Sequence, residues 1–196
     1  ESAVEQMRKT IEEILHVFLI ASGQLTLIPE RSIISPTIND VIVRLSPIIE
    51  ERQLTLHTQN LDGLPSLMLD TEQIDVVFNN VLGNSVKYTP DGGEIWVSGQ
   101  QVNGHVEIVV RDTGIGIPKE EQGRVCDIFH VLGSLLNHST STHAFRGGGL
   151  GLGLPIAKGI IEGHGGTIML ESRGHSLENP PGTTCRIALP IPSQEA

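Results

Sequence analysis

The first part of the chain carries apolar side chains at the three- and four-residue spacing of a helix. This spacing predicts an amphipathic helix over residues 3 to about 22, with its apolar residues on one stripe. The stripe consists of Val4, Met7, Ile11, Ile14, Leu15 and Phe18. Gly, Pro and Ser residues interrupt the pattern over residues 23–36, which predicts a joint. We therefore divide the chain near Leu27, into a helix and joint (residues 1–26) and a main domain (residues 27–196).

The main domain alternates between helical and strand patterns. Asn39 or Asp40 can cap a helix that ends near residue 53, and Asp70 or Thr71 can cap a longer one that ends near Tyr88. A third helix is predicted over residues 152–162, and Asn103-Gly104 is a strong hairpin signal. Strands are predicted at residues 54–58, 67–69, 94–101, 105–111, 167–172 and 184–189. This order favours an α+β fold, a two-layer sandwich with helices on one face of a mixed, mostly antiparallel sheet.

The stretch between Asp112 and Gly147 shows only a short helical signal, at residues 119–129. Long segments without regular structure are uncommon in compact domains and often cover a binding site. We therefore expect a lid at about residues 113–150.

The charge and cysteine content exclude several classes of function. The 196 residues include 13 Lys and Arg against 23 Asp and Glu, a formal charge of -10. This balance argues against a nucleic-acid partner, because phosphate neutralisation needs clustered cations. Cys126 and Cys185 have no partner at metal-binding spacing, and free thiols suit a reducing cytosol. No apolar run is long enough to span a membrane, so we expect a soluble, cytoplasmic piece, whose parent can still be anchored in a membrane.

The long helix carries the first candidate site. At 100° per residue, four polar side chains fall together beside its apolar stripe. They are Gln73, Asn80, Asn84 and Lys87. An amide oxygen suits Mg²⁺ and an ammonium group suits phosphate, so this flank can hold a metal-bound polyphosphate. A solvated helix flank is the alternative.

The second candidate follows an apolar strand, where Asp112 precedes Gly114 and Gly116. A carboxylate here can accept a hydrogen bond from an amino-substituted ring, and the glycines allow the backbone to approach closely. An ordinary Gly-rich turn is the alternative.

The third candidate is the glycine-rich run at residues 147–154, which leads directly into a helix. Glycines before a helix expose unpaired N–H groups at the positive end of the helix dipole, which favours phosphate. A flexible linker is the alternative. The spacing matches neither a Walker loop nor a Rossmann fingerprint.

Taken in order, these three elements resemble the ATP-binding domain of sensor histidine kinases, within the superfamily that includes gyrase, heat-shock protein 90 and MutL. Residues 80–90 resemble the N box of that family, residues 112–117 the G1 box and residues 149–154 the G2 box. Residues 126–129 are similar to the F box, and residues 182–184 to the last turn near the nucleotide. The resemblance covers about residues 35–190 and implies the Bergerat-type ATP-binding fold, with ATP and Mg²⁺ as cofactors.

The resemblance also implies roles for individual residues. Asn84 would be the Mg²⁺ ligand, and Lys87 and Tyr88 would lie near the phosphates. Asp112 would accept from the adenine amino group, and Thr183 would support the water network on the adenine side. The other implied nucleotide-binding positions are Gly114, Gly116, Ile117, Phe129, Gly149, Gly151, Leu152, Gly153 and Leu154.

Asn80 is the implied catalytic residue, and it favours phosphoryl transfer over hydrolysis. The hydrolysing relatives have Glu at this position, and an amide cannot act as the general base that Glu provides. With the acidic charge, Asn80 also counts against a DNA-handling ATPase. A serine or protein kinase of the same superfamily is a further alternative.

Three residues depart from the family pattern. Leu150 replaces a frequent Ser or Thr, Leu132 replaces an aromatic residue, and Gly133 stands where a basic residue is usual. Arg124 and Arg146 are candidate substitutes for the missing basic residue. These departures motivate the alternative of a non-catalytic nucleotide-binding module with a degenerate lid.

None of the eight histidines is followed by the acidic residue that marks a phosphoacceptor in this family. We therefore expect the substrate histidine on a dimerisation domain of the same parent protein. The residues before the joint resemble the tail of a helix of that domain. A homodimeric parent and a response regulator are the implied partners. His164 is expected to cap the C-terminus of a helix as an imidazolium.

Overall fold

The computed structural model describes residues 3–126 and 151–193. Within these ranges, five strands form one sheet in the order β2-β4-β5-β7-β6, in which β2 and β4 are parallel and the other neighbours antiparallel. The strands are β2 (Thr55–Gln59), β4 (Glu94–Val102), β5 (His105–Asp112), β6 (Thr167–Ser172) and β7 (Thr183–Pro190). A second, two-stranded sheet pairs β1 (Glu30–Ser32) with β3 (Leu67–Leu69). The predicted α+β fold with a mixed, mostly antiparallel sheet is confirmed.

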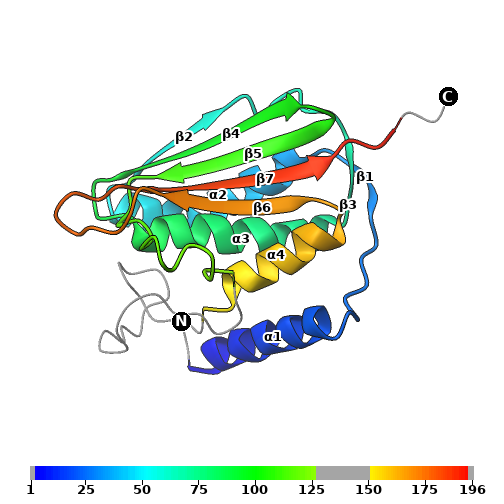
Figure 1. Cartoon of the computed structure of the whole chain (residues 1–196), viewed down its shortest axis with the longest axis horizontal. Coiled ribbons are helices and arrows are strands. Elements are labelled where there is room, and N and C mark those ends of the chain that lie inside the picture. Colours follow the sequence, from blue (N-terminus) through cyan, green and yellow to red (C-terminus); the bar gives the residue numbers. More distant parts are fainter. Residues whose placement is uncertain (1–2, 127–150, 194–196) are drawn as a thin grey trace.

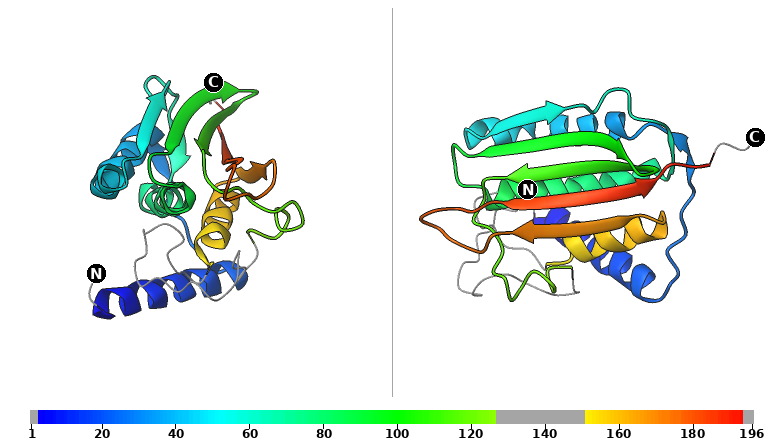
Figure 2. Two further views of the ribbon diagram at one scale, coloured as in Figure 1. Left: turned by 90° about the vertical axis from the view of Figure 1, so that its left-hand side faces the viewer. Right: turned by 45° about the horizontal axis from the view of Figure 1, so that its top comes forward.

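The helices are α1 (Ala3–Ala21), α2 (Ile34–Glu51), α3 (Thr71–Tyr88) and α4 (Gly153–Gly163). Figures 1 and 2 show α2, α3 and α4 covering one face of the large sheet, with α1 on the side of α4 that points away from the sheet. The helical and strand periodicities account for the layer between them, because they aim apolar side chains at a common core. Completely buried members of this core include Phe78 and Ile74 on α3, Ile95 on β4, Ile108 on β5 and Ile160 on α4.

Most predicted elements agree with the structure, and the long helix α3 agrees at both ends. The Asp70 side chain caps it by accepting from Gln73 N, 3.1 Å away. The hairpin turn at Asn103 and Gly104 has φ values of 50° and 77°, as a primed hairpin turn requires.

The helix α2 begins earlier than predicted, so Asn39 and Asp40 lie inside it and do not cap it. The Ser35-Pro36 pair falls in its first turn, where the missing N–H of proline is no loss. Pro47 lies further inside α2 and cannot bond the carbonyl of Val43. Ser46 Oγ donates to that carbonyl instead, at 2.9 Å, which explains how the helix continues.

Two further predictions need correction. The strand β1 lies in the segment interpreted as a joint, because pairing with β3 creates it and its own three residues carry no strand pattern. The helical signal at residues 119–129 forms turns over residues 119–126, in which Glu121 N and Gln122 N both donate to the carbonyl of Pro118. The rest of that signal lies outside the described residues.

His164 ends α4 as predicted, but its charge state differs from the expectation. Its Nδ1 lies 2.8 Å from the carbonyl oxygen of Ile160, and its Nε2 lies 3.0 Å from the backbone N of Asp70. An amide N–H can only donate, so Nε2 must accept and Nδ1 must carry the proton. The ring is therefore the neutral tautomer, and the expected imidazolium is wrong.

The helix α1 contacts the domain through a face other than its predicted apolar stripe. Val17 is buried. Ile20 packs on Gly159 of α4 so closely that a Cβ added to this glycine would lie 2.4 Å from Ile20 Cγ2. The stripe itself faces solvent: Met7, Ile11 and Phe18 are each at least 60% exposed. None of the helices in the described ranges has the length and hydropathy that a membrane span requires.

Candidate functional site

The carboxylate of Asp112 lies at the end of β5, where three separate segments meet. Its Oδ1 accepts from Gly114 N at 2.8 Å and from Thr183 N at 3.0 Å. Its Oδ2 accepts from Ser85 Oγ of α3 at 3.2 Å. The strand pairing brings the segments together, because Asp112 is the register partner of Thr183 on β7. The buried carboxylate is therefore shared by β5, β7 and the long helix.

The side chain of Asp112 is only 6% exposed. Desolvation by burial raises the pKa of this carboxyl to about 6, although the hydrogen bonds from Gly114, Thr183 and Ser85 act in the opposite direction. A carboxylate has about four acceptor positions, and the described residues occupy three of them. One more donor, such as an amino group on a ring, can therefore bind Oδ2.

The glycines around Asp112 allow the backbone segments to touch. Ile115 N donates to the carbonyl of Tyr88 at 3.1 Å, and Gly182 N donates to the carbonyl of Gly114 at 2.8 Å. A Cβ on Gly114 would lie 2.8 Å from Tyr88 O, and one on Gly182 would lie 2.2 Å from Asp112 O. Both contacts are too close for a side chain, so the end of α3, the loop after β5 and the start of β7 form one packed unit.

Gly116 has a packing reason of its own to be glycine. Its φ is +73°, and a Cβ there would meet Gly174 O, Pro181 Cγ and Ser172 Oγ. These atoms belong to the last residue of β6 and to the loop between β6 and β7, which Gly116 joins through an isolated bridge to His175. Ile117, the next residue, is buried.

The N-terminus of α4 lies against the polar flank of α3. A Cβ on Gly153 would lie 2.6 Å from Asn80 Oδ1, so the Asn80 carboxamide packs directly on the first residue of α4. Leu152 is the N-cap and supplies no side-chain hydrogen bond. The helix thus begins with the N–H groups of Gly153 and Leu154 and without a side-chain cap from Leu152. Uncapped N–H groups at a helix N-terminus favour the binding of an anion.

Asn84 lies one turn after Asn80 on the same face of α3, between the contact with Gly153 and the contact of Tyr88 with Ile115. Lys87 and Tyr88 follow, with Lys87 Nζ 4.9 Å from the centre of the Tyr88 ring. All four of these side chains are half-buried. Within residues 3–126 and 151–193, no group of three or more His, Cys, Asp or Glu side chains is placed to bind a metal. Mg²⁺ often takes only one or two protein ligands beside phosphate and water, so a single amide fits this ion.

Some of the remaining predicted nucleotide-binding positions lie within the described residues and others lie outside them. Leu152 is buried, Leu154 packs on the core and Gly151 has a φ of +74°. Phe129 and Gly149 lie outside the described residues, and so do the three departures and Arg146.

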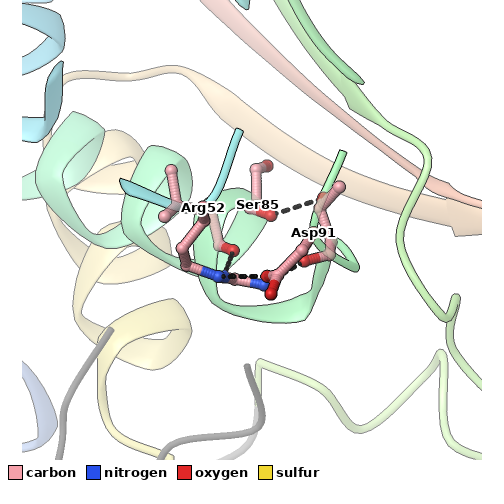
Figure 3. Close-up of polar contacts among 5 residues, drawn as sticks. Arg52, Ser85 and Asp91 are labelled. Carbon is pink, nitrogen blue, oxygen red and sulfur yellow. Dashed lines mark hydrogen bonds and ion pairs between the residues drawn. The ribbon is translucent and has the colours of Figure 1, made fainter. Parts of the chain in front are cut away.

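Arg52 supports the site and was missed by sequence reasoning. It is 7% exposed and donates to the carbonyls of Val86 and Thr89, while its Nε lies 2.8 Å from Asp91 Oδ1 (Figure 3). Thr89 in turn donates from Oγ1 to the carbonyl of Ser85. One guanidinium group therefore fixes the last turn of α3 and the turn that follows it. This last turn adjoins Ser85, whose hydroxyl binds Asp112. The only signal in the sequence is a single Arg at the end of a predicted helix, which carries no spacing pattern.

The long helix α3 thus contacts both the Asp112 carboxylate, through Ser85, and the first residue of α4, through Asn80. A family model described as "Histidine kinase-, DNA gyrase B-, and HSP90-like ATPase" matches residues 69–193, which include all of these residues. The chain belongs to this family.

Sensor histidine kinases are among the most similar curated proteins. The chain is 30% identical over 183 residues to the cell-division control histidine kinase PdhS of Brucella anthropi, covering 92% of this chain and 17% of that protein. It is 34% identical over 149 residues to the alginate biosynthesis sensor protein KinB of Pseudomonas aeruginosa, covering 76% of this chain and 22% of that protein. The chain therefore spans about a fifth of the length of these relatives.

Solved structures of histidine kinases share the fold. The mycobacterial sensor histidine kinase MprB superposes with a TM-score of 0.66 at 28% identity, covering 83% of this chain and 97% of that one. Full-length ShkA in complex with AMPPNP gives a TM-score of 0.76 at 20% identity, covering 97% of this chain and 37% of that one. ThkA in complex with the response regulator protein TrrA gives a TM-score of 0.70 at 20% identity, covering 98% of this chain and 49% of that one. The chain is thus a catalytic ATP-binding domain of the sensor histidine kinase type.

The buried carboxylate makes the stability of this domain depend on pH. The pKa of Asp112 is higher in the folded state than its ordinary value of 3.8, so the charged form is penalised by folding. The contribution of Asp112 is most favourable below pH 3.8 and is lost as the pH rises through about 6. Asp112→Asn keeps an oxygen for Gly114 and Thr183 but does not titrate. We expect its free energy of unfolding, relative to wild type, to increase by about 2 kcal/mol between pH 4.5 and pH 7.5.

Urea denaturation followed by circular dichroism at several pH values measures this difference, in which the other titrating groups cancel. A difference that is the same at both pH values would contradict the buried, proton-binding carboxylate.

Proposed function

We propose that the chain binds Mg²⁺ and ATP and transfers the γ-phosphoryl group to a histidine on a dimerisation domain of the same parent protein. A response regulator would then receive the phosphoryl group. The observation that carries this proposal is the buried Asp112 carboxylate with one acceptor position left, next to a helix flank and a helix N-terminus suited to phosphate. The family match, the AMPPNP complex of ShkA and the regulator complex of ThkA support it.

Asp112 Oδ2 would accept from the adenine amino group, Gly114, Gly116 and Ile117 would lie along the ring, and Thr183 would support the water network on the adenine side. The site's existing hydrogen bonds hold the carboxylate rigidly, so little reorganisation would be needed on binding. The raised pKa still leaves this carboxyl ionised at pH 7, as an acceptor must be.

The phosphates would lie between α3 and the start of α4. Gly151, Gly153 and the N–H of Leu154 would contact phosphate oxygens, with Lys87 and Tyr88 on the opposite side. Asn84 would hold Mg²⁺, which neutralises phosphate charge when bound. The lid positions Phe129 and Gly149 belong to the same proposed site.

The chemistry proposed is an in-line transfer. A histidine ring nitrogen would attack the γ-phosphorus, a P–N bond would form, and the P–O bond to ADP would break, with ADP keeping the electron pair. Asn80 would be the catalytic residue that orients this end of the site. Its amide cannot deprotonate water, which favours transfer over hydrolysis.

The exposed stripe on α1 is the surface that we assign to the dimerisation region. Val4, Met7, Ile11, Ile14 and Phe18 recur at alternating spacings of three and four, the pattern of a helix that packs against other helices. A homodimeric parent that acts in the cytoplasm and can be anchored in the inner membrane is consistent with this surface. The alternative of a non-catalytic module is not favoured, because the curated relatives are named as kinases and sensors.

A labelling experiment tests the transfer. The chain alone, incubated with Mg²⁺ and γ-labelled ATP, should give negligible acid-labile label, because its own histidines lack the phosphoacceptor pattern. Adding the dimerisation domain of the parent should give acid-labile label on that domain. Strong self-labelling of the chain, or no label with the added domain while ATP binds, would contradict the proposal.

A second experiment tests the metal ligand. Asn84→Ala should weaken ATP binding, measured by calorimetry, about tenfold or more in Mg²⁺ and much less in EDTA, because only the metal-dependent part is lost. Asn79→Ala, five positions earlier on α3, is the matched control and should change neither value. Equal losses with and without Mg²⁺ would reject the role of Asn84.

A further inference from the structure

The ends of α3 and α4 that lie away from the proposed ATP site are joined by one pair of residues. Asp70, the N-cap of α3, donates its backbone N–H to Nε2 of His164, the C-cap of α4, at 3.0 Å. The other ring nitrogen of His164 donates to Ile160 within α4. The neutral imidazole thus connects the two helix ends, although 94 positions separate the residues in the chain.

Asp70 also binds the segment that follows α1. Its Oδ1 caps α3 through Gln73 N, and its Oδ2 accepts from the backbone N of Ile28 at 3.0 Å. A cap needs only one oxygen, so the second one is available to attach this segment. Three segments, namely residues 25–28, the start of α3 and the end of α4, therefore meet at Asp70, the first and second at its side chain and the third at its backbone N–H.

Close packing strengthens this attachment. Leu27 Cδ1 lies 2.9 Å from where a Cβ on Gly163 would be, and Ile20 fills the corresponding space at Gly159. Both glycines are on α4, so the end of α1 and the segment after it lie directly on the α4 backbone. Figure 1 shows this segment passing the end of α4 and the start of α3, at the side of the molecule opposite the loop after β5.

At the start of α4 the same two helices meet through Gly153 and Asn80, which lies in the middle of α3. The helices are antiparallel, because the start of α3 lies beside the end of α4, through Asp70 and His164, and the middle of α3 lies beside the start of α4, through Asn80 and Gly153. A shift of one helix along the other would change both contacts together, because packed helices move as rigid elements.

We propose that Asp70 and His164 are positioning residues, which hold α3 and α4 in register and transmit the position of the segment after α1 to the Asn80–Gly153 contact. This inference rests on the proposed function in so far as that contact is part of the ATP site. The pair acts through Asn80 and Gly153 and touches no nucleotide itself. Movement of the dimerisation helix would in this way alter how phosphate is held.

The test uses the full chain with three variants. His164→Leu removes the acceptor for Asp70 N–H, whereas His164→Gln keeps an acceptor of similar reach. Asp70→Ser keeps the helix cap and loses the oxygen that binds Ile28. His105→Leu is the matched control, because that exposed ring bonds the carbonyl of Asn103 in its own hairpin.

Two quantities are measured: amide hydrogen exchange at Ile156, in the first turn of α4, and the affinity for ATP with Mg²⁺. The loss of one neutral hydrogen bond corresponds to roughly a fivefold effect. His164→Leu and Asp70→Ser should each speed exchange at Ile156 and weaken ATP binding by about this factor. His164→Gln and His105→Leu should stay close to wild type. If His164→Leu does not fold, Asp70→Ser against His164→Gln gives the same comparison.

Exchange that rises only near residues 70 and 164, with Ile156 and the ATP affinity unchanged, would overturn the inference and leave an ordinary cap. Wild-type protein that binds no ATP, with exchange at Ile156 still responding to the variants, would refute the proposed function and support the positioning pair.

Discussion

The site depends on one physical constraint, the burial of the Asp112 carboxylate. Removing this group from water is costly, and the fold offsets part of that cost with two backbone N–H groups and one hydroxyl. Each donor comes from a different segment, so the carboxylate stays in place only when the loop after β5, the start of β7 and α3 are all correctly packed. The glycines at positions 114 and 182 allow the close approach that this requires.

The same helix that contributes Ser85 carries the rest of the polar flank, so the position of Asp112 and the position of Asn80 and Asn84 are linked through α3. Arg52 holds one end of this helix and Asp70 holds the other. The site is thus built on a helix fixed at both termini and packed against a second helix, whose glycine start allows the Asn80 contact. Rigid support of this kind is what phosphoryl transfer needs, because positioning supplies most of its acceleration.

Local patterns predicted the parts of this arrangement that depend on near neighbours. Three local features each depend on residues only a few positions apart: the stripe of Ile74 and Phe78, the cap at Asp70 and the turn at Asn103. All three agree with the structure. The strand β1, the role of Arg52 and the contact of His164 with Asp70 could not be predicted in this way. Each depends on a partner far along the chain, such as β3 for β1 or Asp70 for His164, and no local spacing encodes such a partner.

The most direct test of the central claim compares two nucleotides that differ at one position of the ring. Inosine triphosphate has a carbonyl oxygen where ATP has the amino group, so at that position it presents an acceptor, and not a donor, to an ionised Asp112 at neutral pH. Calorimetry with Mg²⁺ should find ATP bound at least about tenfold more tightly than inosine triphosphate, the effect of one unpaired, buried charged acceptor. Equal affinity for the two nucleotides would show that Asp112 does not read the adenine amino group and would contradict the account.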